Sequence, residues 1–185
     1  MITVRQVIEM AARLIGIEEA VDGYFTEENA EGEKAVNALL ACLHLVETEL
    51  ASEYFSLKTE EECDSNGYID FDELSRKPLR IVSVTATDGK AAQATICPMG
   101  IRVKKGVYKI SYQYLPEEKV VDDVLEFDPS VTTALIGYGV AAQYCLTAGL
   151  YEEAVVWDGN DRPCGRCNAM HCGETDSHGR FAPSE

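Results

Sequence analysis

The chain has 185 residues, of which 46% are hydrophobic and 26% charged, a balance typical of a folded globular domain rather than a disordered chain. Thirty-two acidic against sixteen basic side chains give a net charge of −16, which excludes a DNA-binding protein that grips phosphates with a basic surface. No apolar run approaches the roughly 20 residues of a membrane span, and seven cysteines, an odd number, predict reduced thiols rather than a disulfide-bonded secreted protein.

The first segment has the pattern of an amphipathic helix over residues 3–16. Its apolar side chains recur at three- and four-residue spacing, Thr3 and Gln6 have the form of a capping box, and Gly16 is a stop signal. Charged residues lie within this apolar pattern, so the segment is not expected to be a signal peptide.

A connection over residues 17–26 leads to a longer predicted helix over residues 27–55. Glu47 and two other glutamates lie off its apolar stripe, and His44 beside the stripe is expected to be a packing or surface residue rather than a ligand. The stripe consists of Val36, Leu39, Leu40, Leu43, Val46 and Leu50.

Residues 62–73 match the twelve-residue calcium loop of an EF-hand. Three features count against calcium: the first position is Glu62 instead of Asp, Pro78 would stop the exiting helix, and the sequence has no second loop to pair with. The other interpretation is a polar turn that joins two extended segments. The oxygen ligands would be Asp64, Asn66, Asp70 and Glu73, with Gly67 at the sharp turn.

The periodicity changes from helix to strand between residues 79 and 114. Residues 81–87 are rich in β-branched side chains, Asp88 and Gly89 predict a hairpin turn, and residues 91–97 return as the partner strand. Residues 107–114 alternate with one aromatic face. The pattern predicts a small antiparallel sheet of three or four strands.

Asp128 and Pro129 predict the start of another helix, which continues as one apolar helix over residues 131–157. Many of its residues are Gly or Ala, which predicts close packing against other helices. Trp157 near its end is expected to anchor packing rather than bind a ligand.

The tail contains a cluster of soft metal ligands. Cys164, Cys167 and Cys172, with His171 or His178, would supply four ligands for one structural zinc ion. The spacing resembles a zinc knuckle with its last two ligand types exchanged. The other interpretation is a peptide without metal that a partner protein orders.

Together these elements predict an α+β fold: a small helical bundle with an inserted antiparallel β-sheet and an extended C-terminal tail. Residues 1–158 form the predicted helical core domain, with the sheet inserted at about 79–127, and residues 159–185 form the Cys/His-containing tail. The helices 3–16, 27–55 and 130–157 are expected to pack as one core from which the sheet protrudes. No nucleophile elbow, phosphate loop or catalytic pair is recognisable, so the chain is not expected to be an enzyme.

The order of these features resembles the head–tail connector (adaptor or neck) proteins of long-tailed bacteriophages. Three stretches carry the resemblance: ITVRQVIEMAARLIG, GYIDFDELSRKPLRIVSV through VYKISYQYLP, and VTTALIGYGVAAQYCLTAGLYEEAVVWDGNDR. The match covers about residues 1–160, and the Cys/His tail departs from the basic end expected of such proteins. In the family a helix rich in small residues is followed by an ending matched here by Gly149, Tyr151, Glu152, Glu153, Ala154 and Trp157.

The resemblance implies a structural virion protein, made in the host cytoplasm, that forms a homo-oligomeric ring at the head–tail junction, commonly of twelve copies. Its partners would be the portal protein and the tail or neck proteins, with no membrane contact. DNA would pass through the ring without specific binding, and an acidic wall suits this role because it repels phosphate. The alternative functions are a zinc-binding or a calcium-binding protein-interaction module.

Overall fold

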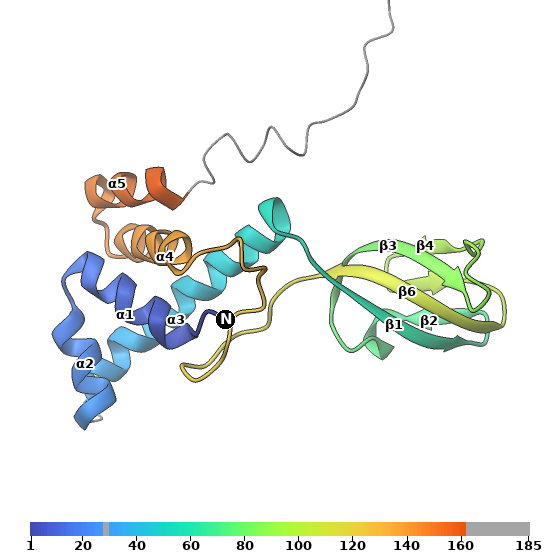
Figure 1. The fold of residues 1–185 in the computed structure, drawn as a ribbon, viewed down its shortest axis with the longest axis horizontal. Helices are drawn as coiled ribbons and strands as arrows, with labels where there is room; N and C mark the ends of the chain where they lie inside the picture. The colour runs from blue at the N-terminus through green and yellow to red at the C-terminus, as the bar shows by residue number, and fades with distance from the viewer. Residues whose placement is uncertain (28–29, 162–185) are drawn as a thin grey trace, which may run out of the picture.

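The computed structural model describes residues 1–27 and 30–161. In this part of the chain a helical lobe and a β lobe lie at opposite ends of an elongated molecule (Figure 1). The α+β fold class predicted from the sequence is confirmed. The helices of the first lobe are α1 (Val4–Ile15), α2 (Glu18–Glu27), α3 (Ala30–Glu49), α4 (Thr133–Thr147) and α5 (Tyr151–Asp161). The strands of the second are β1 (Leu57–Ser65), β2 (Tyr68–Asp70), β3 (Pro78–Ala86), β4 (Thr95–Cys97), β5 (Gly100–Arg102) and β6 (Gly106–Tyr114).

Helix α1 begins and ends where its local sequence predicts. The Thr3 side chain accepts a hydrogen bond from the backbone N–H of Gln6, and the Gln6 side chain accepts one from the backbone N–H of Thr3. This reciprocal capping box satisfies two N–H groups that a helix end leaves unpaired. Gly16 ends the helix with φ +75°, a left-handed conformation that costs little without a Cβ atom.

The predicted connection over residues 17–26 is wrong, because the structure forms helix α2 there. Helix α2 lies against α3 at Gly32, where a Cβ atom would come within 2.4 Å of the Ala20 carbonyl oxygen. The sequence of α2 has little apolar periodicity, so packing against α3 stabilises this short helix.

The second predicted helix is present as α3 followed by one π-helical turn at Leu50–Tyr54. By length and composition alone Ala30–Tyr54 could cross a membrane. The apolar side chains Leu39, Leu43 and Leu50 are each at most 2% exposed and pack in one cluster with α1 and α4. The segment therefore has the position of a core helix.

The β lobe consists of two three-stranded antiparallel sheets, with strand orders β1-β6-β3 and β2-β5-β4. The predicted sheet of three or four strands beginning near residue 79 is therefore too small, because β1 and β2 precede it in the chain. The predicted aromatic face of β6 is confirmed: Tyr108, Ile110 and Tyr112 are buried. They share a second hydrophobic cluster with Ile69 and Ile101 of the smaller sheet, so the two sheets pack face to face.

Residues 115–132 return the chain from the β lobe to the helical lobe. The backbone N–H of Val4 donates to the Asp123 carbonyl oxygen at 3.0 Å, and the N–H of Leu125 donates to the Ile2 carbonyl oxygen at 2.9 Å. These bonds attach the return segment to the beginning of the chain. The sheet insertion predicted at 79–127 therefore differs from the structure at both ends, since strands span residues 57–114.

The single helix predicted over residues 131–157 is also wrong. Thr132 caps α4, α4 ends at Thr147, and Gly149 with φ +77° separates it from α5. The predicted close packing of small residues is confirmed, since a Cβ atom on Gly137 would lie 3.0 Å from the Met10 sulfur of α1. The predicted packing role of Trp157 is confirmed by its stacking on Tyr138, with ring centroids 5.9 Å apart.

Leu43→Ala tests the predicted helical core. Leu43 is 1% exposed, so its truncation should lower the free energy of unfolding by about 2–5 kcal/mol, measured by chemical denaturation. Leu45→Ala is the matched control, because Leu45 lies on the same helix and is 51% exposed. Equal losses for both variants would contradict the assignment of Leu43 to the core.

Candidate functional site

Residues 62–73 do not form the EF-hand loop that is one of the two interpretations of their sequence. Glu62 and Asp64 lie on β1 opposite Lys109 and Val107 of β6, so both residues belong to an extended strand rather than to a loop. No helix–loop–helix forms, because strand β1 leads into the segment and Phe71–Glu73 is a single 3₁₀ turn. The alternative, a polar turn between two extended segments, is confirmed.

The proposed zinc ligands Cys164, Cys167, Cys172, His171 and His178 lie outside the described residues. Within residues 1–27 and 30–161 no group of three or more His, Cys, Asp or Glu side chains has an arrangement that could hold a metal ion. The zinc prediction therefore stays a prediction.

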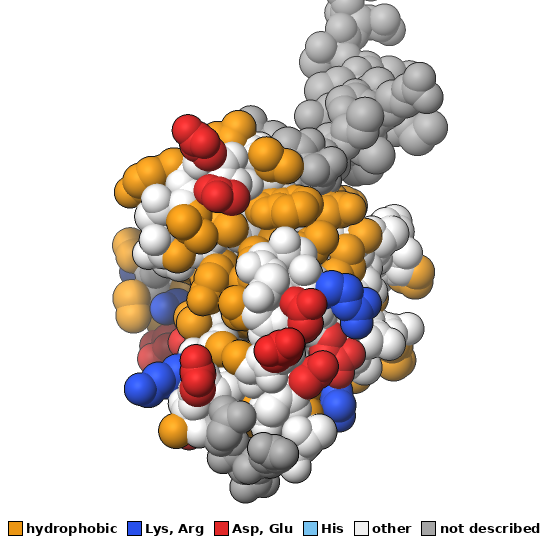
Figure 2. Space-filling model, turned by 90° about the vertical axis from the view of Figure 1, so that its left-hand side faces the viewer, with side chains coloured by type: hydrophobic (Ala, Val, Ile, Leu, Met, Phe, Trp, Pro, Cys, Tyr) orange, Lys and Arg blue, Asp and Glu red, His pale blue; other side chains and the backbone are white. Residues whose placement is uncertain are grey.

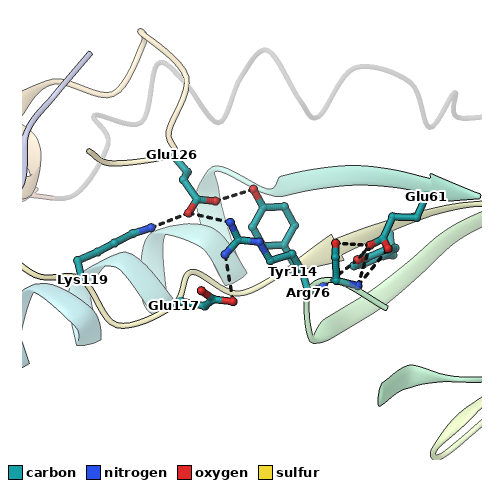
Figure 3. Close-up of polar contacts among 8 residues, drawn as sticks. Glu61, Arg76, Tyr114, Glu117, Lys119 and Glu126 are labelled. Atoms are coloured by element: carbon teal, nitrogen blue, oxygen red, sulfur yellow. Dashed lines mark hydrogen bonds and ion pairs between the residues drawn. The ribbon is translucent and has the colours of Figure 1, made fainter. Parts of the chain in front are cut away.

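A polar network occupies the joint between the two lobes, centred on Glu126 of the return segment (Figure 3). Its carboxylate accepts a hydrogen bond from the Tyr114 hydroxyl at 2.8 Å and from the Lys119 ammonium at 2.5 Å. The Arg76 guanidinium lies 3.5 Å from the same carboxylate and 3.1 Å from that of Glu117. Glu126 thus joins residues from β6, the return segment and the loop before β3.

Electrostatics stabilise the charged form of Glu126. Burial by itself would raise the pKa of Glu126, but the hydrogen bonds from Lys119 and Tyr114 and the charge of Arg76 hold it below its usual value. Burial, together with the hydrogen bond to Glu126, raises the pKa of Tyr114 to about 12. Glu126 therefore remains an anion and Tyr114 a donor at neutral pH.

A second group of polar contacts fixes the base of the larger sheet. Glu61 of β1 accepts hydrogen bonds from the Tyr112 hydroxyl of β6 and from the backbone N–H and side-chain hydroxyl of Ser75. The backbone N–H of Arg76 donates to the Tyr112 hydroxyl at 3.2 Å. The loop that carries Arg76 is therefore held on the sheet while its guanidinium reaches the return segment (Figure 3).

Glu47 of α3 is a buried carboxyl group near this joint. It is 1% exposed, and neither of its side-chain oxygens has a hydrogen-bond partner among the described residues. Burial raises the pKa of Glu47 to about 7; Lys119 opposes this shift, while Glu126 and Asp123 add to it. Glu47 therefore changes charge near neutral pH.

A cavity of about 670 Å³ opens beside the joint, between the first residues of the chain and the return segment. Its lining is mostly apolar and includes Ile2, Tyr114 and Phe127. The two carboxylates in the lining already accept hydrogen bonds within the chain: Glu126 from Tyr114, and Asp128 from the backbone N–H of Ser130 at 2.9 Å. The joint thus has the arrangement of a structural connection between the lobes.

No local pattern in the sequence predicts this joint. Glu47 was expected off the apolar stripe, yet it follows Leu43 by four residues, and this spacing places it on the buried face. The other partners are separated by up to fifty residues, as Arg76 and Glu126 show, and their approach depends on how the return segment folds back.

Comparison of the chain with protein-family models and with curated proteins gives no match.

Glu126→Gln tests the joint. Loss of the charge removes the ion pairs with Lys119 and Arg76, so the free energy of unfolding should fall by about 1–3 kcal/mol, and amide hydrogen exchange in the return segment should accelerate. Glu117→Gln is the control, since Glu117 is 68% exposed and pairs with the same arginine. Its effect should stay below about 1 kcal/mol. An equal effect of both variants would contradict a central role for Glu126.

Glu47→Gln tests the buried carboxyl group. Because the pKa of Glu47 rises from 4.5 to about 7 on folding, wild-type stability should fall as the pH rises between these values. The glutamine variant should lack this loss and be more stable than wild type at pH 8, by roughly 3 kcal/mol at most. Chemical denaturation across this pH range, with the exposed Glu49→Gln as control, measures the difference. Parallel profiles for Glu47→Gln and wild type would contradict the assignment.

Proposed function

We propose that this chain is a structural virion protein whose copies form a ring at the head–tail junction of a tailed bacteriophage. The ring, commonly twelve-fold in the family that the sequence resembles, would lie between the portal protein and the tail or neck proteins, and DNA would pass through it. The protein would be made in the host cytoplasm and would have no catalytic role.

The unequal division of charge between the two lobes is the observation that carries this proposal. Residues 1–56 and 115–161, which contain the helical lobe, hold twenty-one Asp and Glu against four Lys and Arg. Residues 57–114, which form the β lobe, hold eight against nine, and residues 162–185 hold three against three. The acidic excess therefore belongs to the helical lobe alone.

An acidic lobe suits the wall of a DNA channel. Carboxylates at the wall repel the phosphates of the duplex, so DNA can slide without adhering to the protein. In the proposed ring the helical lobe of each copy lines the channel, and its nearly neutral β lobe reaches the neighbouring copy. The elongated two-lobed shape supports this arrangement, because it gives each copy separate surfaces for the channel and for its neighbours (Figure 1).

The polar joint between the lobes also supports a structural role. A ring of identical copies closes only if each copy holds its contact surfaces at one fixed angle. The contacts of Glu126 with Arg76, Lys119 and Tyr114 tie the β lobe to the helical lobe and would maintain this angle.

Purified virions test the proposed function. The chain should be present in multiple copies per particle by quantitative mass spectrometry, and antibody labelling in electron micrographs should place it at the head–tail junction. The major capsid protein is the internal standard for copy number. Absence of the chain from virions, or a single copy per particle, would contradict the proposal.

A further inference from the structure

The outer face of the sheet β2-β5-β4 carries an exposed apolar group with basic residues beside it. The ring of Tyr68 lies across Gly100, where a Cβ atom would come within 2.6 Å of the tyrosine ring, so this face requires a glycine. Met99 in the β4–β5 turn is 62% exposed. Arg102 is paired in register with Tyr68 on the same face.

Two further basic residues follow Arg102 along the chain. Lys104 and Lys105 are exposed in the loop before β6. Within residues 1–27 and 30–161, neither lysine nor Arg102 forms an ion pair. We call Tyr68, Met99, Arg102, Lys104 and Lys105 the β-lobe surface.

The corner between α4 and α5 carries an exposed apolar group with acidic residues beside it. Leu146, Leu150, Tyr151 and Val155 are between 46% and 73% exposed. Glu152 and Glu153 are exposed beside them in the first turn of α5. Figure 2 faces the helical lobe and shows hydrophobic side chains gathered in its upper part, where α5 lies, with acidic side chains among them. We call these six residues the helical corner.

We propose that the β-lobe surface of one copy binds the helical corner of a second copy of this chain. Each surface has an apolar centre, and their charges are opposite, so the contact would bury exposed apolar area and pair Lys104 and Lys105 with Glu152 and Glu153. This inference rests on the proposed ring and identifies the contact that would build it.

The positions of the two surfaces require two copies. They lie in different lobes, at opposite ends of the long axis of the molecule (Figure 1), so one copy cannot bring them together. A contact between unlike surfaces is heterologous: each copy uses one surface toward the copy before it and the other toward the copy after it. Such a contact generates a closed ring when the rotation between copies permits.

A charge exchange tests the contact in the full chain. Sedimentation velocity at low salt should show that wild type self-associates as its concentration rises, and that added salt weakens the association. The variants K104E/K105E and E152K/E153K should each weaken self-association at least about tenfold, because each brings like charges together. An equimolar mixture of the two variants should restore association, since every contact in an alternating assembly then joins opposite charges.

The control variant is E18K/E19K. It makes the same charge change in the first turn of another helix, α2, where Glu18 and Glu19 are exposed. It should retain wild-type association. Circular dichroism of all variants checks that they remain folded. Absence of self-association in wild type, equal association in all variants, or no recovery in the mixture would overturn the inference.

The charge-exchange experiment and the analysis of purified virions can fail independently of each other. Recovery in the mixture together with absence of the chain from virions would support the contact and reject the head–tail role. Multiple copies in virions together with no effect of the charge exchange would support the role and reject this contact.

Discussion

The constraint on which the structure depends is that the inserted β lobe must return the chain to the place where it left. Helices α4 and α5 complete the bundle only because the chain leaves at Leu57 and comes back at Tyr114, and these residues are antiparallel partners. The nine-residue pairing of β1 with β6 therefore does two things. It forms the centre of the β lobe, and it closes the insertion so that α4 can pack against α1 and α3.

This closure places charged residues at the base of the insertion, where two lobes with separate cores meet. Burial there would favour neutral side chains, and Arg76, Lys119, Glu126 and Tyr114 meet this cost by binding one another. Glu47 is different, because it is buried near the return segment and its side chain has no hydrogen-bond partner among the described residues. The joint therefore contains both a satisfied ionic group and a carboxyl group that favours protonation.

The separation into two lobes would allow one strongly acidic chain to associate with itself. The acidic excess lies in the helical lobe, while the β lobe is nearly neutral and exposes Lys104, Lys105 and Arg102. Two acidic helical lobes would repel each other, whereas the basic residues of the β-lobe surface would attract the acidic helical corner. This distribution favours contacts between unlike ends of neighbouring copies over contacts between like ends, the preference that a ring requires.

The sequence by itself determined the features that depend on neighbouring residues. The capping box of α1, the long apolar helix α3 and the alternating face of β6 each follow from side chains a few residues apart, whose spacing fixes one face of a helix or strand. Periodicity also indicated that the sheet is inserted between helices.

Only the tertiary structure decided what depends on distant residues. Strand β1 has a polar sequence, and it forms a strand because it pairs with β6 and not because of its own pattern. The same pairing holds residues 62–65 in an extended conformation, which is incompatible with an EF-hand loop. Helix α2 forms because α3 covers it, and the break at Gly149 lets α5 fold back until Trp157 stacks on Tyr138. The joint of Arg76 and Glu126 brings together residues fifty positions apart, and no local pattern records such a contact.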